Sequence, residues 1–267
     1  AVHVAISEDD GKTWKGMLEL LLNVERNSSA FGDTRPGEDK SVHQVQAVEV
    51  APGKILASVG QHRLCRKLVI FDVDWLYESR RSCDFSDGLE SWSAFRYYQG
   101  IVGHCCYNRQ EMPLLVAHPD RPGKNAIHLG YMPNDSLVQD NDGAVWNFPV
   151  APDGSVHVRL KLPQGSKGVQ LVLNDRWFNP TDTVASYECM YTVPLSRNRL
   201  GIRDAEWHEV TVEWKKNRPA VLSVDGRKKG KLPLVRPTEH GVSYLHFLGG
   251  RIPDKTGIFI DYVDGGK

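Results

Sequence analysis

The stretch Ser7-Glu8-Asp9-Asp10-Gly11-Lys12-Thr13-Trp14 constrains the fold of this chain more than any other. Asp9 suits a tight turn, because a short acidic side chain accepts hydrogen bonds from backbone N–H groups close by in the sequence. Gly11 is expected at a position with a positive φ angle. We expect Thr13 to return the chain to strand geometry and the ring of Trp14 to lie between adjacent sheets. Because apolar strand patterns flank the stretch, it predicts a hairpin turn with a structural role.

The defined positions of this turn, S-x-D-x-G-x-T-W, are all matched, by Ser7, Asp9, Gly11, Thr13 and Trp14. The stretch resembles the Asp-box of sialidase-type β-propellers. The resemblance implies that the first segment is propeller material and that the protein acts on carbohydrate. The alternative is a chance hairpin turn of the Asp-Asp-Gly-Lys type.

Composition limits the class of protein and its partners. The 267 residues suit one large or two ordinary domains. Lys+Arg and Asp+Glu both number 33, so no net field directs the chain toward nucleic acid or an anionic membrane. We therefore expect neither as a partner, and no apolar run reaches the roughly 18 residues of a membrane helix. Five cysteines without C-x-x-C spacing leave the redox compartment undecided.

Residues 1–80 alternate short strand patterns with turn residues. Strands are predicted at 2–6, 16–22, 42–50, 54–60 and 67–72, followed by a short helical turn at 74–78. A spacing of about ten residues per strand is typical of propellers, whose blades take about 40–50 residues each. The segment therefore holds about two blades, which cannot close a ring and would leave strand edges unpaired. Since the chain also opens directly in strand pattern, we expect a processed chain or a C-terminal fragment, with the missing blades upstream of Ala1.

A composition change at 79–82 predicts a domain boundary, with one domain at 1–80 and a second at 81–267. In the second domain, apolar and polar residues alternate at 156–162, 169–173 and 210–214, the pattern of half-buried antiparallel strands. Asp225-Gly226 follows a strand pattern and predicts a hairpin turn. The whole chain is thus predicted to be all-β.

Three later stretches occur in the order of a known sandwich. Trp207–Val212, Val221–Gly226 and Phe247–Gly250 resemble the W-H-x-V-x-V, L-x-V-D-G and L-G-G patterns of the laminin-G/concanavalin A-like family. The resemblance implies an antiparallel jelly roll, and it makes 257–263 the closing strand that pairs beside the first. An unrelated β-sandwich is the alternative.

The predicted strand 42–50 is the candidate inner strand of a blade, where sugars bind in propeller enzymes. Its polar members His43, Gln44 and Gln46, with His62 and Arg63 at the end of the neighbouring strand, can hydrogen-bond sugar hydroxyls or pair with a carboxylate. Alternation places His43 and Gln44 on opposite faces, so histidines packed between blades are an equal alternative.

Sialidase resemblance implies three arginines for the substrate carboxylate, a tyrosine nucleophile with a glutamate, and an aspartate acid/base. Residues 1–80 hold one tyrosine, Tyr77, in the terminal turn, and no motif selects among the arginines. The catalytic residues are therefore unassigned, and we expect this stretch of chain to be inactive by itself.

The sandwich carries a second candidate site. Asn174, Asp175, Trp177 and Tyr187 combine aromatic faces with hydrogen-bonding side chains, which suits sugar rings. The alternative is an ordinary loop with aromatics packed in the core.

No metal site or cofactor follows from motif spacing. A structural Ca²⁺ held by Asp84, Asp87 and Asp261 is one hypothesis, since hard oxygen ligands suit this ion. Solvated turn carboxylates are the favoured alternative.

Together these features favour the C-terminal part of a sialidase-like glycoside hydrolase, secreted or periplasmic, with an appended lectin-like sandwich. Its expected partners are a glycan and upstream blades of the same protein. A non-catalytic carbohydrate-binding module and a purely structural sandwich that braces the propeller remain alternatives.

Overall fold

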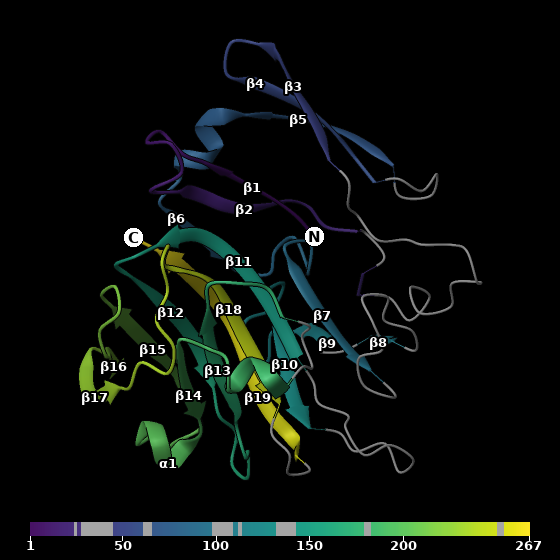
Figure 1. The fold of residues 1–267 in the computed structure, drawn as a ribbon. Helices are drawn as coiled ribbons and strands as arrows, with labels where there is room; N and C mark the ends of the chain where they lie inside the picture. The colour runs from purple at the N-terminus through teal and green to yellow at the C-terminus, as the bar shows by residue number, and fades with distance from the viewer. Residues whose placement is uncertain are drawn as a thin grey trace.

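The computed structural model describes residues 1–23, 26–27, 45–60, 66–97, 109–111, 114–131, 143–178, 183–249 and 254–267. These residues form antiparallel sheets with few helical turns, so the all-β prediction is confirmed. Figure 1 shows two small N-terminal sheets above a larger two-sheet body, with β1 and β2 lying between that body and β3–β5.

The N-terminal region contains two separate sheets. The first is a hairpin of β1 (Val2–Ile6) and β2 (Lys15–Leu21). The second has the order β3 (Gln46–Ala51), β4 (Lys54–Val59) and β5 (Lys67–Asp72), and the 3-10 helix η2 (Val73–Tyr77) follows it. Strands and helical turn lie where the sequence predicted them, except that positions 42–44 of the predicted third strand lie outside the described residues.

The two N-terminal sheets stack through a small apolar cluster. Val2 of the hairpin is buried with Ala57 and Val59 of β4, and Leu20, Leu21 and Phe71 pack against them. Alternation along β3 and β5 sends other apolar residues to the opposite side of the three-stranded sheet. There Val48, Val50, Leu68 and Ile70 are 58%, 51%, 72% and 64% exposed. We call these four residues the outer apolar face.

The larger body is a β-sandwich. One sheet has the order β17 (Arg227–Leu232), β16 (Ala220–Val224), β15 (Trp207–Trp214), β12 (Gly154–Lys161), β19 (Asp254–Gly266), β10 (Asn125–Tyr131), β9 (Leu114–Ala117), and β6 (Arg80–Cys83) also pairs with β19. The other has the order β14 (Tyr191–Leu195), β13 (Val169–Asn174), β18 (Val242–Gly249), β11 (Gly143–Ala151), β7 (Trp92–Tyr97), β8 (Arg109–Glu111). Two short helical turns accompany them, η3 (Thr183–Ser186) and α1 (Arg197–Leu200).

Both sheets contribute to one apolar core. Val156, Val158 and Leu160 of β12 are buried in it, as their alternation predicted. Trp92 lies at its centre, stacked at 5.9 Å on Trp146 and at 6.0 Å on Phe247. Burial of apolar area at about 25 cal/mol per Å² makes this cluster the main source of stability in the sandwich.

Two details of the predicted sandwich are confirmed. Asp225 and Gly226 have φ angles of 49° and 72°, the positive pair that a tight β16–β17 hairpin requires. The closing strand β19 pairs with β6, the first strand of the sandwich, as expected. Since β6 begins at Arg80, the chain enters the sandwich sheet at the predicted boundary, whose position as a domain limit stays a prediction.

Asn147 of β11 joins the hairpin to the sandwich. Its Nδ2 donates to the carbonyl oxygens of Met17 and Ser243, both at 3.1 Å, and its Oδ1 accepts from Glu19 N at 2.9 Å. The buried amide therefore hydrogen-bonds β2 of the hairpin to the sandwich. In the part of the chain that the structure describes, no helix has the length and apolar character needed to span a membrane.

Candidate functional site

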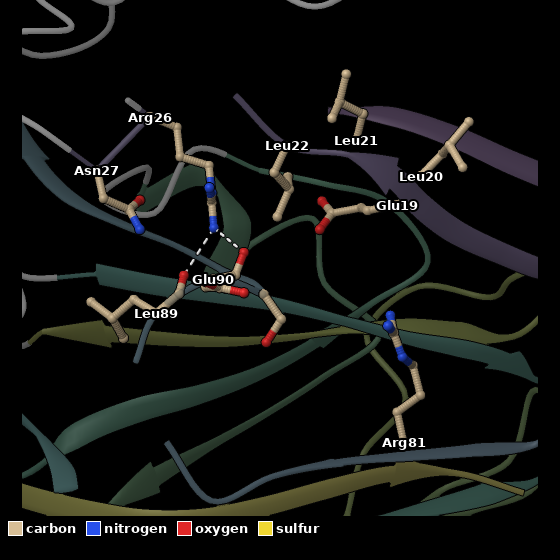
Figure 2. A pocket seen from close by; sticks show the side chains of 10 residues that line it. Glu19, Leu20, Leu21, Leu22, Arg26, Asn27, Arg81, Leu89 and Glu90 are labelled. Carbon is tan, nitrogen blue, oxygen red and sulfur yellow. Dashed lines mark hydrogen bonds between the residues drawn. The ribbon is translucent and has the colours of Figure 1, made fainter. Parts of the chain in front are cut away.

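A cleft of about 660 Å³ lies where the N-terminal hairpin meets the sandwich. We call it the junction cleft. Figure 2 shows it bounded by the end of β2, by β6 and by the turn before β7. Its lining combines apolar and ionised side chains from four separate stretches of sequence: Glu19, Leu20, Leu21, Leu22, Arg26, Asn27, Arg81, Leu89, Glu90, Ser91.

Arg26 and Asn27 hold one wall of the cleft in place. Arg26 donates to the carbonyl oxygens of Trp92 (2.8 Å), Asn23 (3.0 Å) and Leu89 (2.9 Å), and also to that of Glu90. Asn27 donates to Trp92 O at 2.9 Å and accepts from Ala94 N at 2.7 Å. These two side chains fix the wall as structural groups, because they bond the backbone that leads into β7. Burial lowers the pKa of Arg26 to about 10, which leaves it charged at neutral pH.

Glu19 is the buried acid of the junction cleft. Its side chain is 6% exposed, and Oε1 accepts the hydroxyl proton of Tyr244 at 2.9 Å. Its Oε2 accepts no hydrogen bond from any residue that the structure describes. Burial raises the pKa of Glu19 above its usual value, and the charges of Arg26 and Arg81 partly oppose this shift. Figure 2 shows the carboxylate between the two arginines in that view.

Arg81 on β6 supplies the cation opposite Glu19. Its ion pair with Glu78 is long, 3.9 Å, and its guanidinium lies 5.9 Å from the ring of Trp75. Both contacts are weak compared with the 2.7–2.9 Å of a charge-assisted hydrogen bond. The charge of Arg81 is therefore largely available to the cleft.

The Tyr244–Glu19 pair resembles an activated tyrosine in composition, but its environment opposes that chemistry. Tyr244 is 3% exposed, and burial followed by the Glu19 charge raises its pKa well above the usual value. Its oxygen also accepts from His3 Nε2. A phenol held protonated and closed to solvent is a structural donor and not a nucleophile.

The turn at residues 7–14 has the hydrogen bonds expected around Asp9. Oδ1 accepts from Thr13 N at 2.8 Å and Oδ2 from Thr13 Oγ1 at 2.6 Å, while Ser7 Oγ donates to Oδ1 at 3.0 Å and accepts from Gly11 N at 2.8 Å. Gly11 has a φ angle of 82°. The expectation for Trp14 was wrong. Its side chain is 37% exposed, and Nε1 donates to Gly11 O at 3.1 Å, so the ring covers its own turn and does not lie between sheets.

The predicted inner-strand site is mostly outside the described residues. His43, Gln44, His62 and Arg63 all fall there. Gln46, the first residue of β3, is exposed and lies on the same side of the sheet as Val48. The set therefore stays a prediction.

The predicted sandwich site divides into two parts. Asp175 is engaged by Arg236 (2.5 and 3.1 Å) and by Arg176 (3.0 Å), and Tyr187 is 64% exposed beyond η3. Asn174 is 1% exposed, yet among the described residues neither its Oδ1 nor its Nδ2 has a hydrogen-bond partner, and the same holds for Trp177 Nε1. Leaving a buried polar group unpaired costs about 1–3 kcal/mol, so these two residues mark a place where a polar partner would be stabilising.

The proposed Ca²⁺ ligands do not converge. Both oxygens of Asp261 are occupied: Arg159 Nε donates to Oδ1 at 2.7 Å, His118 Nε2 lies 2.8 Å from Oδ2, and Arg121 also pairs with Oδ2. Asp84 instead caps Ser86 N at 3.1 Å, and Asp87 is exposed. Within the described ranges no group of three His, Cys, Asp or Glu side chains could hold a metal. The hypothesis that Asp261 is a Ca²⁺ ligand was therefore wrong, because arginines take its charge.

Sequence reasoning missed the junction cleft. The one local signal was Glu19, the single acid within the apolar run 17–22. On a half-buried strand an acid at this position is expected to face solvent, so it did not stand out as a cleft residue. Nothing in the local pattern connected this acid with Arg81 or Tyr244, which are distant in the sequence.

No protein-family model and no curated protein matches the chain. Among solved structures, it is similar to a sialidase (TM-score 0.43, 12% identity), covering 80% of this chain and 20% of that one. It is also similar to a glycoside hydrolase family 16 endo-glucanase from Bacteroides ovatus, with a TM-score of 0.43 and 14% sequence identity. The match covers 69% of this chain and 99% of that one. A third similar structure is the carbohydrate-binding module CBM66 from Bacillus subtilis, with a TM-score of 0.37 and 7% sequence identity. The match covers 66% of this chain and 93% of that one. The chain spans about a fifth of the length of the sialidase.

Proposed function

We propose that this chain is part of a sialidase-like glycoside hydrolase that acts on glycans outside the cytoplasm. Residues 1–80 would contribute about two blades to a β-propeller, and residues 81–267 would form an appended concanavalin A-like sandwich. The observation that carries the proposal is the Asp9 turn, whose bonds to Ser7 and Thr13 form inside a two-stranded hairpin.

Sheet stacking in the N-terminal region supports the same proposal. The hairpin packs on one side of the β3–β5 sheet, and the other side presents the outer apolar face to solvent. A sheet with two apolar sides is the geometry of a blade that has a neighbour on each side. The expected partner of the outer apolar face is a further blade of the same protein.

Hydrolysis of 4-methylumbelliferyl glycosides, including that of N-acetylneuraminic acid, tests the proposal in the complete protein that contains this chain. We expect turnover of at least one glycoside. Gln46→Ala should lower kcat/KM, whereas Gln170→Ala on β13 should not. Absence of turnover across the panel would overturn the hydrolase assignment, and equal kinetics for Gln46→Ala would remove this residue from the site.

Non-catalytic carbohydrate binding by the sandwich is the second candidate, favoured by the unpaired atoms of Asn174 and Trp177. A glycan hydroxyl could supply the partner that each of these atoms lacks. A glycan array probed with the chain should then give binding that Asn174→Ala reduces and Gln170→Ala leaves intact. If the complete protein is inactive and the array is also negative, the purely structural sandwich is the remaining alternative.

A further inference from the structure

The junction cleft carries a pair of opposite charges whose bonding capacity the described residues use only in part: Tyr244 and His3 both approach Glu19 at Oε1. Glu19 Oε2 receives no hydrogen bond among the described residues, although its side chain is nine-tenths buried. Arg81 reaches its ion-pair partner Glu78 only at 3.9 Å. By contrast, the arginine on the opposite wall, Arg26, is bonded to four backbone carbonyls. A buried acid and an unsaturated guanidinium around one cavity are costly for folding alone.

Apolar side chains complete the lining. Leu20, Leu22 and Leu89 border the cleft beside the two charged groups. A volume of about 660 Å³ falls in the range of about 300–1,000 Å³ that is typical of small-molecule sites. Such a lining fits a ring-shaped ligand with three features: an apolar face for the leucines, a hydroxyl donor for Glu19 and an anionic group for Arg81.

We infer that the junction cleft binds a hydroxylated carboxylic acid of monosaccharide size, such as a hexuronic acid. Arg81 pairs with the ligand carboxylate, and Glu19 Oε2 accepts a hydrogen bond from a ring hydroxyl. Leu22 and Leu89 cover the apolar face of the ring. Its lining contains no residue of the predicted inner-strand set and not Asn174, so the inference goes beyond the proposed hydrolase and does not depend on it.

Placement between the hairpin and the sandwich gives the ligand a second effect. Glu19 belongs to β2, while Arg81 belongs to β6 in the sandwich sheet. A ligand that bonds both residues joins the two units. It should therefore stabilise the docked arrangement, by an amount that rises with the logarithm of one plus the ratio of ligand concentration to Kd.

Isothermal titration calorimetry of the whole chain with D-glucuronate tests the inference, with D-glucose as the matched probe that lacks the carboxylate. We expect glucuronate to bind at least about tenfold more tightly than glucose, as expected for one charge-assisted hydrogen bond. Arg81→Gln should abolish this preference. Glu19→Gln should weaken both sugars, because its amide still accepts from Tyr244 but can no longer offer a charged acceptor to the ring.

Arg227→Gln, an exposed arginine on β17, serves as the control and should bind as the wild type does. Circular dichroism confirms that each variant is folded. Equal affinity for glucuronate and glucose, no heat from glucuronate at millimolar concentration, or unchanged binding by Arg81→Gln would each overturn the inference. Since neither the glycoside panel nor Asn174→Ala involves this cleft, failure here is distinguishable from failure of the proposed function.

Discussion

The hydroxyl of Tyr244 donates to Glu19 Oε1 across 2.9 Å and thereby links β18 of the sandwich to β2 of the hairpin. Both side chains are buried, and the same hydroxyl oxygen accepts from His3 of β1. One phenol therefore organises the polar part of an otherwise packed junction, and the hairpin and sandwich should behave as coupled units.

Removal of this hydroxyl tests the coupling. Tyr244→Phe leaves the buried Glu19 Oε1 without its donor and also removes the partner of His3 Nε2, so we expect the unfolding free energy to fall by about 1–3 kcal/mol. Urea denaturation followed by tryptophan fluorescence measures the loss. Tyr77→Phe is the control, since its hydroxyl bonds Glu8 at an exposed position and its removal should have a much smaller effect. Equal losses for the two variants would contradict the role given to Tyr244.

Glu19 makes stability depend on pH with a defined sign. Burial raises its pKa above the usual 4.5, so the folded chain binds more protons than the unfolded chain between 4.5 and the raised value. Stability contributed by this group is therefore present below pH 4.5 and lost as pH rises through the folded pKa. The difference in unfolding free energy between wild type and Glu19→Gln should fall across that interval.

His3 provides the opposite slope at the same junction. Burial lowers its pKa from 6.5 to about 4, so the unfolded chain binds more protons between these values. The difference between wild type and His3→Gln should therefore rise with pH from about 4 to about 6.5. Denaturation of wild type, Glu19→Gln and His3→Gln at several pH values measures how each difference in unfolding free energy changes with pH. If both differences changed in the same direction, one of the two assigned pKa shifts would be contradicted.

The Asp9 turn can be tested locally by hydrogen exchange. Asp9→Ala removes the acceptor of Thr13 N and Thr13 Oγ1, so exchange at the Thr13 amide should accelerate while amides of β13 keep their protection. Asp9→Asn retains one acceptor oxygen and should show a smaller acceleration. Unchanged exchange at Thr13 in Asp9→Ala would show that the turn does not depend on this carboxylate.

Asp261 should be among the most sensitive charged residues of the sandwich. Its side chain is fully buried and neutralises Arg159 and Arg121, which remain partly exposed. Asp261→Asn leaves these cations without their counter-charge, and we expect a loss of about 3 kcal/mol in unfolding free energy. Asp87→Asn, at an exposed turn, should change stability by less than about 0.5 kcal/mol. Similar values for both would contradict the structural role of the cluster.

Local sequence patterns predicted the strands well because burial on one face imposes a period of two on each strand. Val156, Val158 and Leu160 carry this period without interruption, and Asp225-Gly226 carries the backbone angles of its hairpin. Asp9 and Gly11 likewise predicted the tight turn at residues 7–14, because eight consecutive residues specify its conformation.

Tertiary arrangement decided the features that sequence reasoning missed. Trp14 found a partner in the carbonyl of Gly11 inside its own turn, which a family pattern of buried tryptophan does not reveal. In the sequence, the three strands β3–β5 lie between Glu19 and Arg81. Whether the two side chains come near each other therefore depends on how the hairpin docks on the sandwich. Likewise, the pairing of Asp261 with Arg159 follows from strand register and not from any local motif.

Stacking of blades is the central claim, and the outer apolar face tests it most directly. The measurement is the unfolding free energy of Val48→Glu/Ile70→Glu, made both in this chain and in the complete protein that contains it. We expect little change in the chain, where both residues are exposed, and a loss of at least about 3 kcal/mol in the complete protein, where a neighbouring blade would bury the new charges. Equal stability of variant and wild type in the complete protein would contradict the account.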